Sequence, residues 1–327
     1  MRIVRIAGIG AVAVAGLALT ACGGNIGSAG GGDEFPTGPI TLTVGQAAGG
    51  STDLIARAVA DGMAEELGVS VPVVNKPGAN GAIATQEVAS AEADGYNLVL
   101  LNASLITITP LAVGDSAEVA LDDLDVLKGL SQDDYVLVAS RASGIESFED
   151  LAEHDDLSYG TTGVGTGSQL AQAILFAEAG IEGTVVPFDS GSPALTAVVG
   201  DQVQVATIQA GEAKPQIDAG EVTPLLTFSE ERNEYLPDVP TATEIGYDIP
   251  VAQYRAVAGP KGLPDEVKEA LTTAIEGALE TEAYQQLNET NLLTPHEISG
   301  DEVVEEWTGL ADTYAELVEQ HDISLSE

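Results

Sequence analysis

The sequence predicts an α/β protein with two lobes, each built around its own sheet. Short β-rich runs alternate with helical patterns over most of the 327 residues, which is typical of βαβ units with mostly parallel strands. Two of the junctions between such a run and the following helix are rich in glycine. Ligands of open α/β folds bind at the carboxyl ends of the strands, where both junctions are expected to lie. We therefore expect a ligand cleft between the two lobes.

The first residues have the pattern of a targeting segment. "MRIVRIAGIGAVAVAGLALTAC" has a short cationic start, an apolar stretch too short to span a membrane, and the ending Leu-Thr-Ala-Cys. That ending resembles the lipobox of bacterial lipoproteins, in which the cysteine thiol is acylated before cleavage. We expect residues 1–21 to be a lipoprotein signal peptide, Cys22 to carry the lipid, and residues 22–34 to form a flexible tether. A secreted chain with a free thiol at Cys22 is the alternative.

The first lobe begins with a strand, a glycine loop and a helix. "ITLTV" at 40–44 precedes "GQAAGG", and apolar residues then recur at helical spacing through "STDLIARAVADGMAEELG". A strand at 71–75, a helix near 82–91 and a strand at 97–101 continue the alternation. This order predicts parallel strands joined by crossover helices.

A second series of the same kind starts with a strand at 135–140. From residue 157, "LSYGTTGVGTGSQLAQAILF" is again strand, glycine loop and helix. After a strand beginning at 251, helices are expected at 264–277, 282–291 and 301–321, packed on the first lobe. These divisions predict lobe 1 at 35–134 and 251–327, and lobe 2 at 135–250.

The chain is strongly acidic, with 52 acidic and 11 basic residues and a formal net charge of −41. This charge excludes nucleic acid as a partner, because binding to phosphates needs a basic surface. The acidic residues are spread over predicted helix faces rather than collected in one block. Such a distribution favours a solvated surface, and our hypothesis is that the surface is adapted to salt.

The first glycine loop does not fit the nucleotide-binding motifs. A P-loop needs a lysine directly after its last glycine, whereas Ser51 and Thr52 follow Gly50 here. "GQAAGG" does not match the dinucleotide pattern G-x-G-x-x-G either. A glycine-lined helix N-terminus still offers backbone N–H groups and a positive dipole end to a carboxylate or other small anion. One such loop could merely form the turn and cap the helix, but two loops favour a ligand held from both lobes.

The sequence shows no pattern typical of catalysis or of metal or cofactor binding. The three histidines, His154, His296 and His321, lie in acidic segments away from both glycine loops. Cys22 is the only cysteine of the chain, so neither a cysteine nucleophile nor a structural zinc site is expected. We therefore expect a binding protein rather than an enzyme, with no cofactor.

Longer motifs follow one another along the chain: "VGQAAGGSTDLIARAVADGMAEELG", "VVNKPGANG", "LSYGTTGVGTGSQLAQAILF", "LPDVPTATEIGY" and "AVAGPKGLPDEV". Together they resemble the Bug family of extracytoplasmic solute-binding receptors, which serve tripartite tricarboxylate transporters. The resemblance covers the chain from Phe35 onward. It implies a type II periplasmic-binding-protein fold, in which crossover strands join two lobes that close on one small solute.

The resemblance also implies which residues hold the solute. In this family the two glycine loops hold a carboxylate through backbone N–H groups, hydroxyls and ordered waters. The matching positions are Ala47, Ala48, Gly50, Thr52 and Asp53 in one lobe, and Thr162, Gly163, Gly165, Thr166 and Ser168 in the other. The residues expected to border the same cleft are Asn102, Ser104 and Ser190.

The chain departs from the family pattern at several positions that bear on specificity, two of which concern the predicted site residues. Gln46 stands where a phenylalanine is common, and "QYR", which ends in Arg255, stands where an aromatic residue is typical. Arg255 would offer a charge-assisted hydrogen bond to a carboxylate if it faces the cleft. An exposed or ion-paired arginine at this position is an equal alternative.

The resemblance implies a monomeric, lipid-anchored receptor outside the cytoplasmic membrane. We expect it to capture a small carboxylate and, by closure of its lobes, to deliver it to the permease subunits of a tripartite tricarboxylate transporter. A receptor of the same fold that reports its ligand to a membrane signalling partner is the alternative.

Overall fold

The structure is a computed structural model that describes residues 35–113, 119–154, 156–233, 235–249 and 251–326. The predicted signal peptide, Cys22 and the predicted tether all lie outside these residues. Within the described ranges, no helix is both long enough and apolar enough to cross a membrane.

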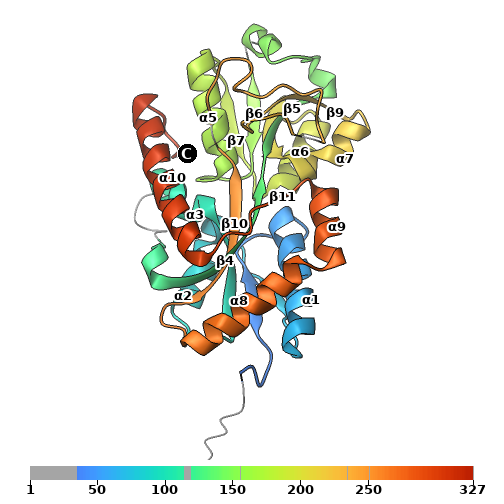
Figure 1. Cartoon of the computed structure of the whole chain (residues 1–327). Helices are drawn as coiled ribbons and strands as arrows, with labels where there is room; N and C mark the ends of the chain where they lie inside the picture. The colour runs from blue at the N-terminus through green and yellow to red at the C-terminus, as the bar shows by residue number, and fades with distance from the viewer. Residues whose placement is uncertain (1–34, 114–118, 155, 234, 250, 327) are drawn as a thin grey trace, which may run out of the picture. The chain divides into compact units, whose positions relative to one another are not determined.

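The first sheet contains six strands in the order β11-β4-β10-β3-β1-β2. Their bounds are β1 Thr41–Val44, β2 Val73–Asn75, β3 Asn97–Asn102, β4 Leu124–Asp133, β10 Gln253–Pro260 and β11 Thr294–Pro295. β1 is parallel to β2 and β3, because helices α1 (Ser51–Leu67) and α2 (Ala82–Ala89) carry the chain back between these strands. β10 is antiparallel to β3 and β4, so a late segment of the chain lies in the middle of this sheet (Figure 1).

The second sheet contains five strands in the order β7-β6-β8-β5-β9. Their bounds are β5 Tyr135–Ser140, β6 Ser158–Thr161, β7 Thr184–Pro187, β8 Val205–Gln209 and β9 Val222–Thr227. β6 is parallel to β7 and β8, and β5 is antiparallel to β8 and β9. The helices that follow β6, β7 and β8 are α5 Gly167–Ala179, α6 Gly191–Val199 and α7 Ala210–Asp218. Two sheets with their own helices confirm the predicted α/β fold of two lobes.

The connections between the two sheets are close to the middle of the fold. The chain leaves the first sheet at the end of β4, and a single residue, Asp134, separates β4 from β5. It returns to the first sheet between β9 and β10.

The described residues also form several short helices. These are α3 Ala103–Thr107, α4 Thr109–Val113, and the 3₁₀ helices η1 Ala79–Gly81, η3 Leu121–Asp123, η4 Arg141–Ser143 and η5 Glu149–Glu153.

The last three helices differ in which lobe they cover. Helices α8 (Asp265–Leu279) and α9 (Glu282–Asn291) pack on α1, and α9 also contacts α7 of the second lobe. In α10 (Gly300–Gln320), Trp307 joins a core cluster of the first lobe, whereas Tyr314 joins one of the second lobe. With a rise of about 1.5 Å per residue, a helix of 21 residues is long enough to reach both lobes. Helix α10 therefore packs on the first lobe, as expected, and on the second lobe as well.

Candidate functional site

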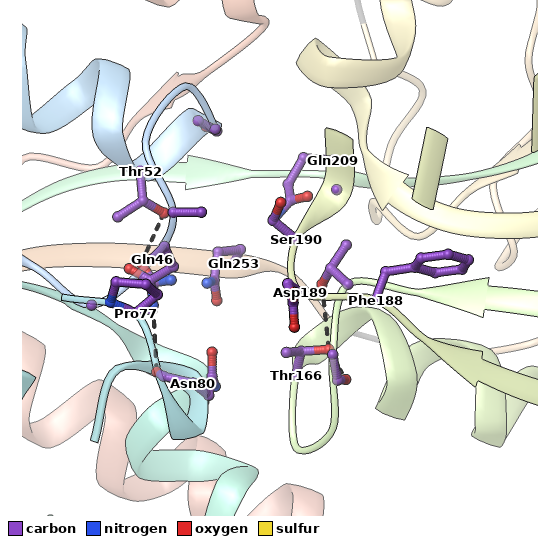
Figure 2. Close-up of a pocket in the computed structure, with 18 of the residues that line it drawn as sticks. Gln46, Thr52, Pro77, Asn80, Thr166, Phe188, Asp189, Ser190, Gln209 and Gln253 are labelled. Atoms are coloured by element: carbon purple, nitrogen blue, oxygen red, sulfur yellow. Dashed lines mark hydrogen bonds between the residues drawn. The ribbon is translucent and has the colours of Figure 1, made fainter. Parts of the chain in front are cut away.

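A cavity of about 590 Å³ lies among the loops at the carboxyl ends of β1, β3, β6 and β8. The first lobe lines it with residues from 45–52 and 77–80 and with Asn102. The second lobe contributes residues from 162–166 and 187–191, together with Gln209 and Glu212. Both glycine loops therefore face one cavity, as the close-up in Figure 2 shows for residues on either side.

The predicted site residues fall into two groups. Those that line the cavity are Gln46, Ala47, Gly50, Thr52, Asn102, Thr162, Gly163, Thr166 and Ser190. Those that do not line it are Ala48, Asp53, Ser104, Gly165, Ser168 and Arg255. Ala48 is exposed, Asp53 holds the first glycine loop, and the other four support a residue of the wall or join the two lobes.

The Asp53 side chain holds the first glycine loop in its conformation. Its Oδ2 accepts hydrogen bonds from the Gly49 backbone N–H (2.9 Å) and Arg57 Nε (3.0 Å), and its Oδ1 accepts from Arg57 Nη2 (2.8 Å) and Asn75 Nδ2 (2.9 Å). Burial by itself raises the pKa of Asp53, but these hydrogen bonds outweigh burial and hold the pKa below its ordinary value. The Asp53 carboxylate thus fixes the turn, in which Gly49 has a φ of 91° that favours glycine.

A chain of hydrogen bonds connects the buried Arg255 with Thr52 and Asn102, which both line the cavity. Arg255 is 1% exposed, and its Nε donates to Thr52 Oγ1 at 3.2 Å, which in turn donates to Asn102 Oδ1 at 3.4 Å. Arg255 Nη1 pairs with Asp133 Oδ2, which also accepts from Ser51 Oγ at 3.1 Å. Of the alternatives for Arg255, the structure shows the ion-paired arginine. Because a buried charge needs a partner, Asp133 explains why Arg255 lies inside the protein.

Hydroxyl groups hold the second glycine loop in shape. Ser168 Oγ accepts from the Thr162 backbone N–H at 2.8 Å, and Thr166 Oγ1 donates to the Gly163 carbonyl at 2.8 Å. Thr166 is also the N-cap residue of α5. The loop therefore lies at the positive end of a helix of 13 residues, where an anionic group is stabilised.

Asn80, which the sequence prediction missed, joins the two lobes. Its Nδ2 donates to Ser104 Oγ (3.0 Å) and Thr109 Oγ1 (3.0 Å) in the first lobe and to the Gly165 carbonyl (3.2 Å) in the second. Thr109 Oγ1 also donates to the Gly165 carbonyl at 3.0 Å. Asn80 has a φ of 50°, which asparagine tolerates better than most residues. The motif "GANG" around Asn80 predicts a turn, but it gives no indication of the hydrogen bond to the Gly165 carbonyl in the other lobe.

Glu212 forms a second connection between the lobes and was also missed. It lies in the first turn of α7, and its Oε1 accepts from the backbone N–H of Ser51, the first residue of α1, at 3.0 Å. A Cβ on Gly191, the first residue of α6, would overlap Glu212 Oε2. Burial raises the pKa of Glu212, although the Ser51 N–H and the charge of Arg255 act against this rise.

The wall of the cavity is rich in acceptors. Among the described residues that line it, none is Lys, Arg or His. Four enclosed side-chain oxygens of the wall have no hydrogen-bond partner among the described residues: Gln46 Oε1, Gln209 Oε1, Glu212 Oε2 and Gln253 Oε1. The three glutamines are labelled around the same space in Figure 2. Because an unmet buried acceptor costs about 1–3 kcal/mol, this part of the wall suits a ligand that donates hydrogen bonds.

Gln209 was missed although a signal for it exists. It ends β8 directly before α7, as Asn102 ends β3 directly before α3. Because ligands of open α/β folds bind at the carboxyl ends of the strands, this position alone would have pointed to Gln209. Within the part of the chain that the structure describes, no group of His, Cys, Asp and Glu is arranged to hold a metal ion.

Comparisons with known proteins establish the family. Residues 55–306 match the family described as "Tripartite tricarboxylate transporter family receptor". BugT of Bordetella pertussis is 30% identical over 305 residues, which cover 87% of this chain and 92% of that protein. The solved structure of the periplasmic binding protein BugD has a TM-score of 0.82 and 27% identity, and covers 90% of this chain and 100% of that chain. MatC of Rhodopseudomonas palustris, solved with bound malate, has a TM-score of 0.80 and 26% identity, covering 87% and 100%. The chain therefore belongs to the receptor family of the tripartite tricarboxylate transporters, as its resemblance to the Bug proteins predicted.

Proposed function

We propose that this protein is a lipid-anchored solute-binding protein that captures a small carboxylate and delivers it to the permease subunits of a tripartite tricarboxylate transporter. Membership of the family makes the chain an extracytoplasmic solute receptor rather than an enzyme. The lipid at Cys22, the tether at 22–34, the monomeric state, the carboxylate and delivery by lobe closure are the proposed additions. The proposed lobes are 35–134 with 251–327, and 135–250.

One observation supports the capture of a solute above all others. The two glycine loops belong to different sheets and line a single cavity of about 590 Å³. Small-molecule sites commonly measure about 300–1,000 Å³. The loop at 162–166 adds the positive end of α5 and the hydroxyls of Thr162 and Thr166. These groups suit a carboxylate, and the malate bound to MatC supports this choice for a relative of 26% identity.

The net charge of −41 is compatible with a carboxylate ligand. Charges further away than about 8 Å are largely screened at physiological ionic strength. Backbone N–H groups and bridging waters next to the ligand therefore outweigh distant surface carboxylates.

Two contacts between the lobes support delivery by closure. The Asn80 side-chain amide donates to the Gly165 carbonyl, and the Ser51 backbone N–H donates to the Glu212 carboxylate. Asn80, Ser51 and Glu212 line the cavity, and Gly165 is next to residues that do. A solute held by both lobes favours the state in which these contacts form. A permease that recognises this state would receive loaded receptor in preference to empty receptor.

A thermal-shift screen tests the proposed function. The protein used is residues 22–327 with Cys22→Ser, and the probes are dicarboxylates, tricarboxylates, acidic amino acids and aromatic acids. We expect at least one acid to raise the melting temperature. Ser190→Ala should reduce that rise, because Ser190 lines the cavity, whereas Ser192→Ala on the exposed side of α6 should not.

Two outcomes would contradict the proposal. One is that no acid raises the melting temperature, and the other is that both serine variants respond alike. Uptake of the acid by cells that lack the gene then separates transport from sensing. Transport requires that uptake is lost, whereas a sensing receptor leaves it intact.

A further inference from the structure

Gly165 lies where the second glycine loop meets the first lobe. Its carbonyl accepts hydrogen bonds from Asn80 Nδ2 at 3.2 Å and from Thr109 Oγ1 at 3.0 Å, and both donors belong to the first lobe. Gly165 has a φ of 69°, and a Cβ placed on it would lie 2.9 Å from Thr109 Cα. A glycine is therefore needed for the two backbones to approach this closely.

The N–H of the same residue is held from within the second lobe. It donates to Gln169 Oε1 at 2.8 Å, and Gln169 Nε2 donates to the Leu325 carbonyl at 3.2 Å. Gln169 is 6% exposed and does not line the cavity. Both ends of its amide are thus engaged, one by the glycine loop and the other by the residues that follow α10.

The residues after α10 are fixed on the second lobe. His321 Nε2 lies 3.3 Å from Glu178 Oε1 in the last turn of α5, whereas the Leu325 carbonyl meets Gln169 in the first turn of the same helix. The segment 321–325 therefore runs back along α5. Leu325 is 2% exposed and belongs to a core cluster of the second lobe, so its side chain anchors the carbonyl that holds Gln169.

The Leu325 carbonyl decides which end of the Gln169 amide faces the loop. An amide carries an oxygen that accepts hydrogen bonds and an NH₂ group that donates them, and a carbonyl can bind only the NH₂ group. Because Leu325 takes the NH₂ group, the oxygen faces the Gly165 N–H. If the amide turned over, two donors would meet at Gly165 and two acceptors at Leu325, and each of these groups would lose its partner.

We propose that Gln169 positions the second glycine loop against the first lobe, and that the C-terminal segment 321–325 sets the orientation of Gln169. The segment thereby takes part in solute binding without touching the solute. Because equilibrium coupling is reciprocal, a solute that holds the loop against the first lobe also stabilises the docked segment. This inference rests on the proposed function and adds a positioning device to the same site.

A measurement without ligand tests how the loop is held. Hydrogen exchange of the Gly165 amide is followed by nuclear magnetic resonance on residues 22–327 carrying Cys22→Ser. Gln169→Met keeps a side chain of similar size and removes both hydrogen bonds, so the Gly165 amide should exchange about two- to tenfold faster.

Gln172→Met is the matched control for Gln169→Met. Gln172 is buried one turn further along α5, and neither polar atom of its side chain has a hydrogen-bond partner within the described ranges. The same substitution at this position should therefore leave the exchange rate of the Gly165 amide at the wild-type value.

A second pair of variants tests the C-terminal segment. Leu325→Ala weakens the apolar anchor and changes no residue of the glycine loop, so the Gly165 amide should exchange at least about twofold faster. Leu151→Ala makes the same truncation at a residue of the same cluster that is 1% exposed, and it should leave the Gly165 rate unchanged. Equal rates in these two variants would overturn the role of the segment. This pair tests the device even if Gln169→Met does not fold.

Calorimetric titration with malate, the acid bound to MatC, connects the loop to solute binding. Gln169→Met should weaken malate binding about two- to tenfold, and Gln172→Met should not weaken it. A Gly165 amide that exchanges at the wild-type rate in Gln169→Met would overturn the positioning role. Unchanged malate affinity in a variant whose Gly165 amide exchanges faster would overturn it as well. If malate does not bind even the wild type, the receptor function fails for this acid, whereas the exchange rates still decide how the loop is held.

Discussion

The backbone N–H of Ser51 donates to Glu212 Oε1 over 3.0 Å, which ties the first turn of α1 in one lobe to the first turn of α7 in the other. The other oxygen of the same carboxylate is enclosed in the wall of the cavity without a partner. One side chain thus connects the lobes and presents charge to the site. Substitutions at Glu212 and at the second bridge, Asn80, should separate these roles.

Glu212→Gln should raise the melting temperature of the ligand-free protein at pH 7.5. Burial raises the pKa of Glu212 in the folded state, so the folded protein keeps its proton to a higher pH than the unfolded chain does. Stability therefore falls as the pH rises from the ordinary pKa to the raised one, and the loss persists above it. Scanning calorimetry should show a higher melting temperature for Glu212→Gln than for the wild type. Equal values would mean that the Glu212 charge costs no stability.

Asn80→Gly should weaken the binding of every solute by a similar factor. Glycine adopts the φ of 50° without strain, so the change removes mainly the amide bonds to Ser104, Thr109 and Gly165. Only the bond to the Gly165 carbonyl joins the two lobes, and one such bond is worth about 0.5–1.5 kcal/mol, so a loss of about two- to tenfold in affinity is expected. Calorimetric titration measures it.

Asp201→Gly is the matched control for Asn80→Gly. Asp201 has a similar φ of 52° but is exposed and lies outside the cavity wall, so its substitution should preserve the wild-type dissociation constant. A loss in Asn80→Gly that is confined to one class of solute would show that Asn80 contacts the solute and does not act through closure.

Arg255→Met should destabilise the protein by about 3–5 kcal/mol, because it leaves Asp133 buried without its cationic partner. The double variant Arg255→Met with Asp133→Asn should recover part of this loss, since neither charge is then present. Urea unfolding monitored by circular dichroism measures both free energies of unfolding. A single variant as stable as the wild type would show that this ion pair does not support the fold.

Added salt should stabilise the protein against heat. A net charge of −41 repels itself in the folded state, and raising NaCl from about 0.1 M to about 2 M shortens the screening distance from about 10 Å to less than about 3 Å. The melting temperature should therefore rise over this range. A flat or falling melting temperature would contradict salt adaptation of the surface.

Cys22→Ala should release the full-length protein from membranes. The lipobox-like ending Leu-Thr-Ala-Cys makes Cys22 the proposed acylation site, and a chain without the thiol cannot be acylated there. Detergent-phase partitioning of cell extracts should place the wild type in the detergent phase and the variant in the aqueous phase. A wild-type protein that remains in the aqueous phase would support the unmodified secreted form.

Local patterns carried most of what the sequence could predict. β1, the first glycine loop and α1 follow one another directly, so the sequence could place Gly50 and Thr52 at the carboxyl edge of a sheet. Glu212 and Asn80 could not be found in this way, because each acts on a partner in the other lobe.

The orientation of Arg255 was open for a different reason. β10 lies in the interior of its sheet, between β4 and β3, and burial on both faces removes the alternation that would show where a side chain points. Its partner Asp133 comes from β4, which is distant in sequence. Helix α10 shows the same limit, since its apolar stripe predicts burial but not which lobe covers each turn.

The position of a bound solute in a crystal structure of the complex tests the receptor most directly. We expect one solute in the cavity, with its carboxylate at residues 162–166. A solute bound outside this cavity would contradict the proposed capture between the lobes.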